Sequence, residues 1–345
     1  MVGIASYGIY IPPWRLSAAD IAHVWGKNEG HVQAGLGVVE KAVAGVDEDT
    51  VTLGYEAAWR AVKSAGISPA RVGALFVGSE SHPYAVNPTA TIIGEFLGLQ
   101  TGYFAADTEF ACKAGTTAMI VVDGLLRSGR CAYGLAIGAD CGQAKPHDIL
   151  EYTAGSGAAA CMLTSDENAI AVELVDVCSY STDTPDFWRR DGISYPSHGG
   201  RFTGEPSYFR HVTGAATDMM NKHAMKPADI DFAVFHMPNG KFPREVAKRL
   251  GFSPEQVATS LVVDKIGNPY SASSLIGLAA TLDEAKPGQT VLMVSYGSGA
   301  GSDAFLFRTT KKLPGLIKKQ HSVKQKISMK QYVSYDTYLK MRGVI

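Results

Sequence analysis

Cys112 is the residue whose position most favours covalent chemistry. It lies in DTEFACKAGTTAM (107–119), between an extended stretch and the small-residue start of a helix. The dipole and the free backbone N–H groups of a helix start favour a thiolate, Lys113 adds positive charge, and the same N–H groups could hold a thioester oxyanion. The position predicts a cysteine nucleophile for acyl transfer, with a small buried cysteine as the alternative interpretation.

Three further residues with suitable chemistry lie near strand ends. His236 follows the apolar strand DFAVF, and Asn268 lies in GNP before a helix. Taken alone, the histidine could be structural and the asparagine a turn residue or helix cap. Glu80 closes the strand containing ALFVG, where desolvation would raise its pKa to suit a general acid/base, although an exposed loop glutamate also fits. A cysteine, a histidine and an asparagine that meet at strand ends form a stronger pattern than any one of them.

An internal repeat explains how these segments could meet. Pro69-Ala70 and Pro227-Ala228 lie 158 residues apart, and each begins a turn that leads into an apolar strand. Two helices rich in small residues end at Gly129 and Gly288, an offset of 159 residues. Two repeats at nearly the same offset indicate a duplicated unit of roughly 150 residues, in which the ends of equivalent strands converge.

The repeated units predict a layered α/β fold. The helical stretches 114–126 and 272–282 are rich in Ala, Gly and Ser, which suits helices buried between two sheets. The continuous apolar strands GALFVG, AYGLAIG and VLMVSYG suit sheets that are covered on both faces. No G-x-G-x-x-G follows a first strand and no P-loop motif occurs, which disfavours a nucleotide-binding fold.

The composition is typical of a water-soluble globular protein. The 345 residues are 46% hydrophobic and 19% charged, and this length allows about two core units. No apolar run approaches the roughly 18 residues of a membrane span, and the start MVGIASYGIYIPPW lacks a basic n-region, so we expect a cytoplasmic protein. Five cysteines without a C-x-x-C pair argue against both a disulfide framework and a zinc site.

The end of the chain forms a basic tail. Residues 311–345 contain nine Lys or Arg and one acid, a balance of +8, so with a net charge of −1 residues 1–310 carry −9. Tyr332, Tyr335 and Tyr338 lie three residues apart, which suits one face of a short helix. We therefore expect a tail docked on the body or on an acidic partner, and not a nucleic-acid-binding arm.

The segments that carry these residues resemble loops of the thiolase superfamily. FACKAGT is similar to the family's nucleophile segment, FHMPNGKFP to its histidine loop, GNPYSASS to its asparagine loop and SYGSGAGSDAF to its final glycine hairpin. GSESHPYAVNP resembles the glutamate loop of archaeal-type 3-hydroxy-3-methylglutaryl-coenzyme A (HMG-CoA) synthases. Ketoacyl-carrier-protein synthase III shares the other reactive loops but has no matching glutamate. The resemblance covers residues 1–310, and the tail ending SYDTYLKMRG also looks like that type.

The resemblance implies a thiolase fold, an α/β architecture with duplicated αβαβα layers. It divides the chain into an N-terminal half (1–165) with the Glu and Cys loops and a C-terminal half (166–310) with the His and Asn loops. The basic tail (311–345) follows as a docked segment.

The resemblance also implies a role for each reactive residue. Cys112 would take an acetyl group from acetyl-CoA as a thioester, and Glu80 would remove a methyl proton from it. The resulting enolate would attack acetoacetyl-CoA, while His236, positioned with Asn268, protonates the alkoxide. Water then releases HMG-CoA. The resemblance implies neither a metal nor a cofactor, since CoA thioesters are the substrates and a thioester already acidifies its α-protons.

Further substrate contacts are implied at scattered positions. They are Asn28, Glu29, Thr153, Arg201, Thr203 and Ser298, with Lys241 as a phosphate partner for CoA. Where archaeal-type sequences place an arginine nine residues after the histidine, this chain has Glu245, and we assign that contact to the preceding Arg244.

The implied partners are a second copy of the chain in a homodimer, an acetoacetyl-CoA thiolase and a small OB-fold (DUF35-type) linker protein. Neither nucleic acid nor a membrane is implied. Two alternatives remain: a ketoacyl-carrier-protein synthase III-like enzyme, against which Glu80 argues, and a non-catalytic scaffold of a thiolase complex. A scaffold would be expected to have lost some of the reactive residues, whereas this chain has Glu80, Cys112, His236 and Asn268 together.

Overall fold

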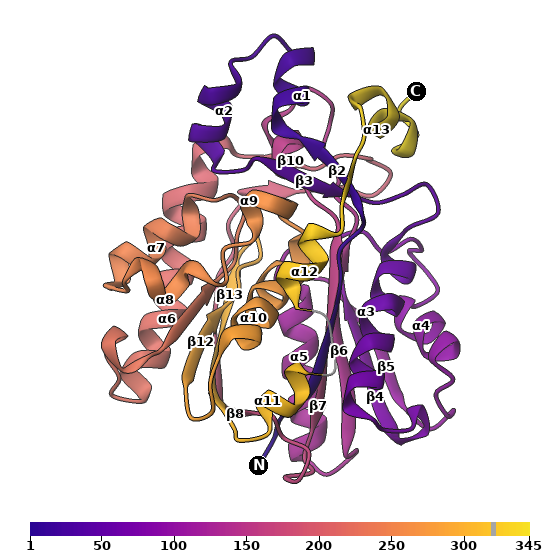
Figure 1. The fold of residues 1–345 in the computed structure, drawn as a ribbon, viewed down its shortest axis with the longest axis vertical. Coiled ribbons are helices and arrows are strands. Elements are labelled where there is room, and N and C mark those ends of the chain that lie inside the picture. Colours follow the sequence, from indigo (N-terminus) through magenta and orange to yellow (C-terminus); the bar gives the residue numbers. More distant parts are fainter. Residues whose placement is uncertain (319–321) are drawn as a thin grey trace.

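A nine-stranded sheet forms the centre of the computed structural model, which describes residues 1–318 and 322–345 (Figure 1). The strand order is β11-β12-β13-β8-β1-β7-β6-β4-β5. These strands are β1 (Gly3–Tyr10), β4 (Val72–Gly78), β5 (Phe104–Thr108), β6 (Tyr133–Asp140), β7 (Gly157–Thr164), β8 (Val172–Ser181), β11 (Phe232–Phe235), β12 (Thr290–Val294) and β13 (Gly301–Thr309). Smaller sheets pair β2 (Trp14–Ser17) with β3 (Glu40–Val43) and β14 (Gln331–Tyr332), and β9 (Phe187–Trp188) with β10 (Ser197–His198).

Helices lie on the outer faces and between the two halves of this sheet. The central helices α5 and α10 share one apolar core and pack on β4 and β6 and on β11 and β12. On the outside, α3 packs on β1, β6 and β7, and α6 packs on β8 and β13. The layers therefore run αβαβα, as the sequence resemblance implied. The helices are α1 (Ala18–Val24), α2 (Glu29–Leu36), α3 (Thr50–Ala65), α4 (Thr89–Leu97), α5 (Ala114–Arg127), α6 (Arg210–Lys222), α7 (Phe242–Leu250), α8 (Pro254–Ala258), α9 (Val263–Ile266), α10 (Ser273–Glu284), α11 (Leu313–Ile317), α12 (Val323–Ser328) and α13 (Tyr335–Met341).

The two halves repeat the same run of elements. A 3₁₀ turn at Pro69–Arg71 leads into β4, and another at Pro227–Asp229 leads into β11. β4 pairs in parallel with β6 and β11 with β12, and β6 and β12 then take the antiparallel partners β7 and β13. The predicted central helices 114–126 and 272–282 are confirmed as α5 and α10. Residue 165 lies between β7 and β8, and we retain the division of the chain there as a proposal.

The basic tail lies along the body of the protein. β14 pairs in parallel with β2, and α13 buries Tyr335 and Tyr338 among apolar side chains of α1, β2 and β3. Tyr332 lies in β14 and is 60% exposed. The prediction that all three tyrosines share one helix face is therefore wrong for Tyr332, because strand pairing holds that residue in an extended conformation before the helix begins.

Two buried carboxylates of the body hold this tail. Glu40 accepts a hydrogen bond from Lys330 Nζ at 2.5 Å, and Glu151 accepts one from the Tyr335 hydroxyl at 2.8 Å. Glu151 also accepts from Trp25 Nε1 at 3.1 Å. The docking thus combines buried polar contacts with apolar packing.

Removing the Tyr335 side chain should destabilise the protein. Tyr335→Phe leaves the buried Glu151 carboxylate without one donor, which costs about 1–3 kcal/mol, and Tyr335→Ala should cost about 3–5 kcal/mol because the ring is lost as well. Urea unfolding of both variants measures these losses. Ile345→Ala, at the exposed terminus, is the control. Wild-type stability in both Tyr335 variants would show that the tail is not anchored through this contact.

The described residues include no helix long and apolar enough to cross a membrane. All five cysteines are free thiols. Within the same ranges, no group of three His, Cys, Asp or Glu side chains is arranged to hold a metal ion.

Candidate active site

Four loops from both halves of the repeat converge on one site. Glu80 follows β4, Cys112 precedes α5, His236 follows β11 and Asn268 follows α9. Cys112, His236 and Asn268 line the same cavity, and Glu80 is hydrogen bonded to Cys112. The structure therefore brings together the four residues that sequence reasoning selected from separate segments.

The contact between Cys112 and Glu80 follows from the close packing of β4 on α5. A Cβ on Gly78, the last residue of β4, would lie 2.1 Å from the carbonyl carbon of Ala114, so only glycine allows this approach. The residues just beyond β4 and just before α5 consequently meet. The Cys112 thiol donates a hydrogen bond to Glu80 Oε1 at 2.8 Å.

The electrostatic surroundings of Cys112 differ from the prediction. Burial raises the pKa of its thiol well above the ordinary value, and Glu80 raises it further. Lys113 points away, with its Nζ 3.0 Å from both carboxylate oxygens of the buried Asp303. The prediction that Lys113 favours a thiolate is wrong for the resting site, because the buried Asp303 carboxylate neutralises that ammonium group. Cys112 thus rests as a thiol bonded to its neighbouring carboxyl.

Glu80 has the pKa of a base that works near neutral pH. Burial raises the pKa of its carboxyl to about 8, and the charge of Asp140 adds to this shift. Asp140, at the end of β6, accepts hydrogen bonds from the Glu80 backbone N–H at 2.8 Å and from the Ser79 and Ser81 hydroxyls at 2.7 Å each. It also accepts from the Ser271 N–H at 2.9 Å. Asp140 therefore ties the glutamate loop to the segment that follows Asn268.

His236 is a neutral imidazole in an aromatic pocket. Burial lowers its pKa to about 3, and its ring centroid lies 6.5 Å from that of Tyr208 and 6.3 Å from that of Tyr296. The Tyr208 hydroxyl donates to the His236 carbonyl oxygen at 2.6 Å and fixes the end of the strand. The Nδ1 atom of His236 is buried and has no hydrogen-bond partner among the residues that the structure describes.

Asn268 is held by the backbone on both sides. Its N–H donates to the Thr153 carbonyl at 2.6 Å, and its own carbonyl accepts from the Gly155 N–H at 3.0 Å. The side-chain Oδ1 accepts from the Tyr270 N–H at 3.0 Å, which sets the orientation of the amide. A hydrogen bond from this side chain lowers the pKa of Cys112, against the larger effects of burial and Glu80.

The cavity in front of these residues has a volume of about 390 Å³. Four of the predicted contact residues line it: Thr153, Arg201, Thr203 and Ser298. Lys241 and Arg244 instead line a neighbouring hollow beside Phe242, a residue that both spaces share. Asn28 and Glu29 lie at the start of α2, whose last residue, Leu36, lines the cavity. Asn28 caps that helix by accepting from the His31 N–H, and Glu29 accepts from the Gln33 amide.

Relatives of known name match the whole chain. Hydroxymethylglutaryl-CoA synthase from Archaeoglobus fulgidus is 56% identical over 345 residues, which is 100% of this chain and 99% of the relative. The chain belongs to the hydroxymethylglutaryl-CoA synthase family. The synthase of the same name from Methanopyrus kandleri is 51% identical over 341 residues, 99% of this chain and 97% of the relative.

Solved structures place this synthase in the predicted thiolase fold. MvaS in complex with 3-hydroxy-3-methylglutaryl coenzyme A matches with a TM-score of 0.90 at 25% identity, over 99% of this chain and 91% of that one. 3-Oxoacyl-(acyl carrier protein) synthase III, FabH, from Pseudomonas aeruginosa matches with a TM-score of 0.82 at 21% identity, over 90% and 98% of the chains, and shares the fold. Residues 220–309 match the family described as 3-oxoacyl-(acyl-carrier-protein) synthase III C terminal.

Sequence reasoning missed two supporting carboxylates of this synthase. Asp140 ends the apolar strand AYGLAIGAD much as Glu80 closes its own strand, so the same criterion could have selected it. Asp186 is buried, and it accepts from the Tyr296 hydroxyl at 2.7 Å and from the Gly299 N–H at 2.9 Å beside the cavity. Nothing in the local sequence distinguishes Asp186 from its acidic neighbours, since the two partners that hold it beside the cavity, Tyr296 and Gly299, lie more than 100 residues away.

Proposed function

We propose that this chain condenses acetyl-CoA with acetoacetyl-CoA and water to give HMG-CoA and CoA, in the mevalonate route to isoprenoids. The observation that carries this proposal is the 2.8 Å hydrogen bond between Cys112 and Glu80, within a chain 56% identical to a named synthase. A thiol nucleophile and a carboxyl base in contact are what successive acylation and enolisation of one acetyl group require.

The first step is transfer of the acetyl group to Cys112. Sγ attacks the carbonyl carbon of acetyl-CoA, the bond to the CoA sulfur breaks, and the thiol proton leaves with CoA. The reactive species in this attack is the thiolate of Cys112. The acetyl methyl group then lies beside the Glu80 carboxyl, because Oε1 already contacts Sγ.

Condensation forms the new carbon–carbon bond. The Glu80 carboxylate takes a methyl proton, and the enolate carbon attacks the 3-keto carbon of acetoacetyl-CoA. His236 is neutral, so one of its ring nitrogens carries a proton that it gives to the developing alkoxide, with Asn268 orienting the same oxygen. The proton that Glu80 took from the methyl group replaces the one that His236 gave, so Glu80 is again a carboxylate and His236 a neutral imidazole before hydrolysis. Hydrolysis of the thioester then frees the HMG-CoA product and restores Cys112.

The proposed binding residues lie around the reacting residues, in the substrate cavity and in the hollow next to it. Thr153, Arg201, Thr203 and Ser298 line the cavity that receives the thioester arm. Lys241 and Arg244 lie in the adjoining hollow together with Lys248, where their positive charges suit the phosphates of CoA. Asn28 and Glu29 remain proposed contacts at the far end of α2.

The oligomeric and partner assignments are also proposals. Homodimer formation is supported by large apolar side chains exposed on the neighbouring α4 and the edge strand β5, Phe96 and Phe104. A complex with an acetoacetyl-CoA thiolase and an OB-fold (DUF35-type) linker protein rests on the sequence resemblance, as does a cytoplasmic location.

The condensation rate should rise with pH up to about 8. Glu80 must be ionised to accept the methyl proton, and its pKa is raised to about 8, so the active fraction falls about tenfold for each pH unit below that value. His236 has a pKa of about 3 and stays neutral throughout this range, so its titration causes no further rise or fall in the pH–rate profile. Single-turnover reaction of acetylated enzyme with acetoacetyl-CoA measures the profile. A flat profile between pH 6 and 9 would contradict the assignment of Glu80 as the base.

Substrate choice separates this proposal from its enzymatic rival. The purified chain, given acetyl-CoA, should consume acetoacetyl-CoA and should not extend a malonyl-carrier protein. Condensation with the malonyl-carrier protein alone would favour a ketoacyl-carrier-protein synthase III-like activity. Absence of both reactions would favour the scaffold.

A further inference from the structure

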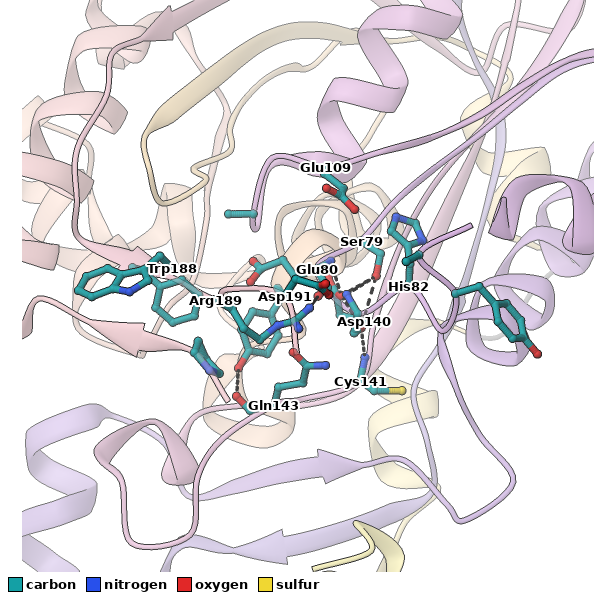
Figure 2. A pocket seen from close by; sticks show the side chains of 17 residues that line it. Ser79, Glu80, His82, Glu109, Asp140, Cys141, Gln143, Trp188, Arg189 and Asp191 are labelled. Carbon is teal, nitrogen blue, oxygen red and sulfur yellow. Dashed lines mark hydrogen bonds between the residues drawn. The ribbon is translucent and has the colours of Figure 1, made fainter. Parts of the chain in front are cut away.

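A second cavity, of about 500 Å³, lies beside Glu80 (Figure 2). Glu80 lines this second cavity, whereas Cys112 lines the substrate cavity. Phe187 and Tyr270 line both and form the wall between them. The 2.8 Å hydrogen bond between thiol and carboxyl therefore connects the two spaces.

The second cavity is lined largely by polar groups. Glu109, Asp140, Gln143, Arg189 and Asp191 surround Glu80 in Figure 2. Arg189 Nη2 donates to the Glu80 carbonyl oxygen at 3.2 Å, which places the arginine over the glutamate loop. Such a lining holds water well, and the volume has room for several molecules at about 30 Å³ each.

His82 gives an independent indication of bound water. Its side chain lines the cavity and is only 8% exposed, and its Nδ1 lies 2.8 Å from the Thr89 hydroxyl and 3.3 Å from Asp107. Its Nε2 is buried and has no hydrogen-bond partner among residues 1–318 and 322–345. Buried polar atoms of this kind are usually satisfied by ordered water.

The proposed reaction needs such a space. It consumes one water molecule and releases one proton for each HMG-CoA formed. During hydrolysis, the CoA arm of the bound intermediate occupies the substrate cavity of about 390 Å³, which closes that approach to the thioester. Water then has to reach the carbonyl carbon from the side on which Glu80 lies.

We propose that the second cavity stores the hydrolytic water, delivers it past Glu80 and carries the released proton to solvent; this inference rests on the proposed function. The water oxygen bonds to the thioester carbonyl carbon while one water proton passes to the Glu80 carboxylate. The carbon–sulfur bond then breaks, and Cys112 Sγ takes that proton back from Glu80. The new carboxylic acid gives up its remaining proton to the water in the cavity.

Filling the mouth of the cavity tests this route. Ala85 lines the cavity and is exposed, so Ala85→Trp adds bulk there without displacing core residues. Gln143→Phe narrows the cavity from another side as a second variant. Val86→Trp is the matched control, because Val86 is the next residue on the same loop and is 90% exposed. Intact-protein mass spectrometry, at intervals after mixing with acetyl-CoA and then acetoacetyl-CoA, follows each covalent form of Cys112.

Both filled variants should acetylate and condense at near wild-type rates, yet hydrolyse at least about tenfold more slowly, so that the condensed HMG-CoA adduct on Cys112 accumulates. The acetylation rate itself reports an intact site. Wild-type hydrolysis in both variants, or equal slowing in Val86→Trp, would overturn the water route while leaving the proposed function in place. Failure of the wild-type chain to acetylate or condense at all would instead overturn the proposed function.

Discussion

Glu80→Ala should still accept an acetyl group on Cys112 but should condense it with acetoacetyl-CoA roughly 10²–10⁴-fold more slowly, the usual loss for a missing general base. The methyl protons of the acetyl group are removed only in condensation, and Glu80 Oε1 is the group in contact with the sulfur that carries the acetyl. Intact-protein mass spectrometry measures the first half-reaction, and single-turnover formation of HMG-CoA measures the second.

Two further variants sharpen this test. Glu80→Gln keeps the shape of the side chain but cannot take a proton, so its condensation should fall to a similar level. Glu95→Gln removes an exposed carboxylate of α4 in the same half of the chain and should react at the wild-type rate. Near wild-type condensation in Glu80→Ala would remove Glu80 from the mechanism.

His236→Ala and Asn268→Ala should also keep acetylation while using acetoacetyl-CoA poorly. Both side chains serve the keto oxygen on which negative charge develops, and loss of one such donor costs roughly 10²–10³ in rate. The backbone hydrogen bonds of Asn268 to Thr153 and Gly155 survive its substitution, so the loop should keep its place. The measurement is the rate of HMG-CoA formation from pre-acetylated enzyme.

A histidine outside the site provides the control for these variants. His223 pairs with Asp176 at 2.7 Å beyond the end of α6, and His223→Ala should condense normally. If His236→Ala or Asn268→Ala failed at acetylation and condensed normally once acetylated, their assignment to the second substrate would be wrong.

The fold could be predicted from the sequence because its signals are local and occur twice. The helices that became α5 and α10 are rich in small residues, and the 3₁₀ turns that begin at Pro69 and Pro227 start the same structural unit in each half. An internal repeat also predicts which strand ends meet, which is why Cys112 and His236 could be assigned to one site. The sequence resemblance then supplied a role for each residue.

The contacts that adjust the chemistry could not be predicted, because they join residues far apart in the chain. Lys113 turns from Cys112 toward Asp303, 190 positions away, and Asp140 reaches 60 residues back to the Glu80 loop. Both contacts depend on how two halves of a sheet pack, and no local pattern encodes that packing. Tyr332 has helical spacing from Tyr335 but pairs with β2 at the other end of the chain.

Every later step of the mechanism depends on covalent acetylation of Cys112, which intact-protein mass spectrometry after incubation with acetyl-CoA alone detects. The wild-type chain should gain one acetyl group, and peptide mapping should place it on Cys112. Over the same time, Cys112→Ser should gain none. The other four cysteines are also free thiols, so the mapping discriminates among them. Acetylation at another residue, undiminished acetylation of Cys112→Ser, or no acetylation of the wild-type chain would show that Cys112 is not the acyl carrier.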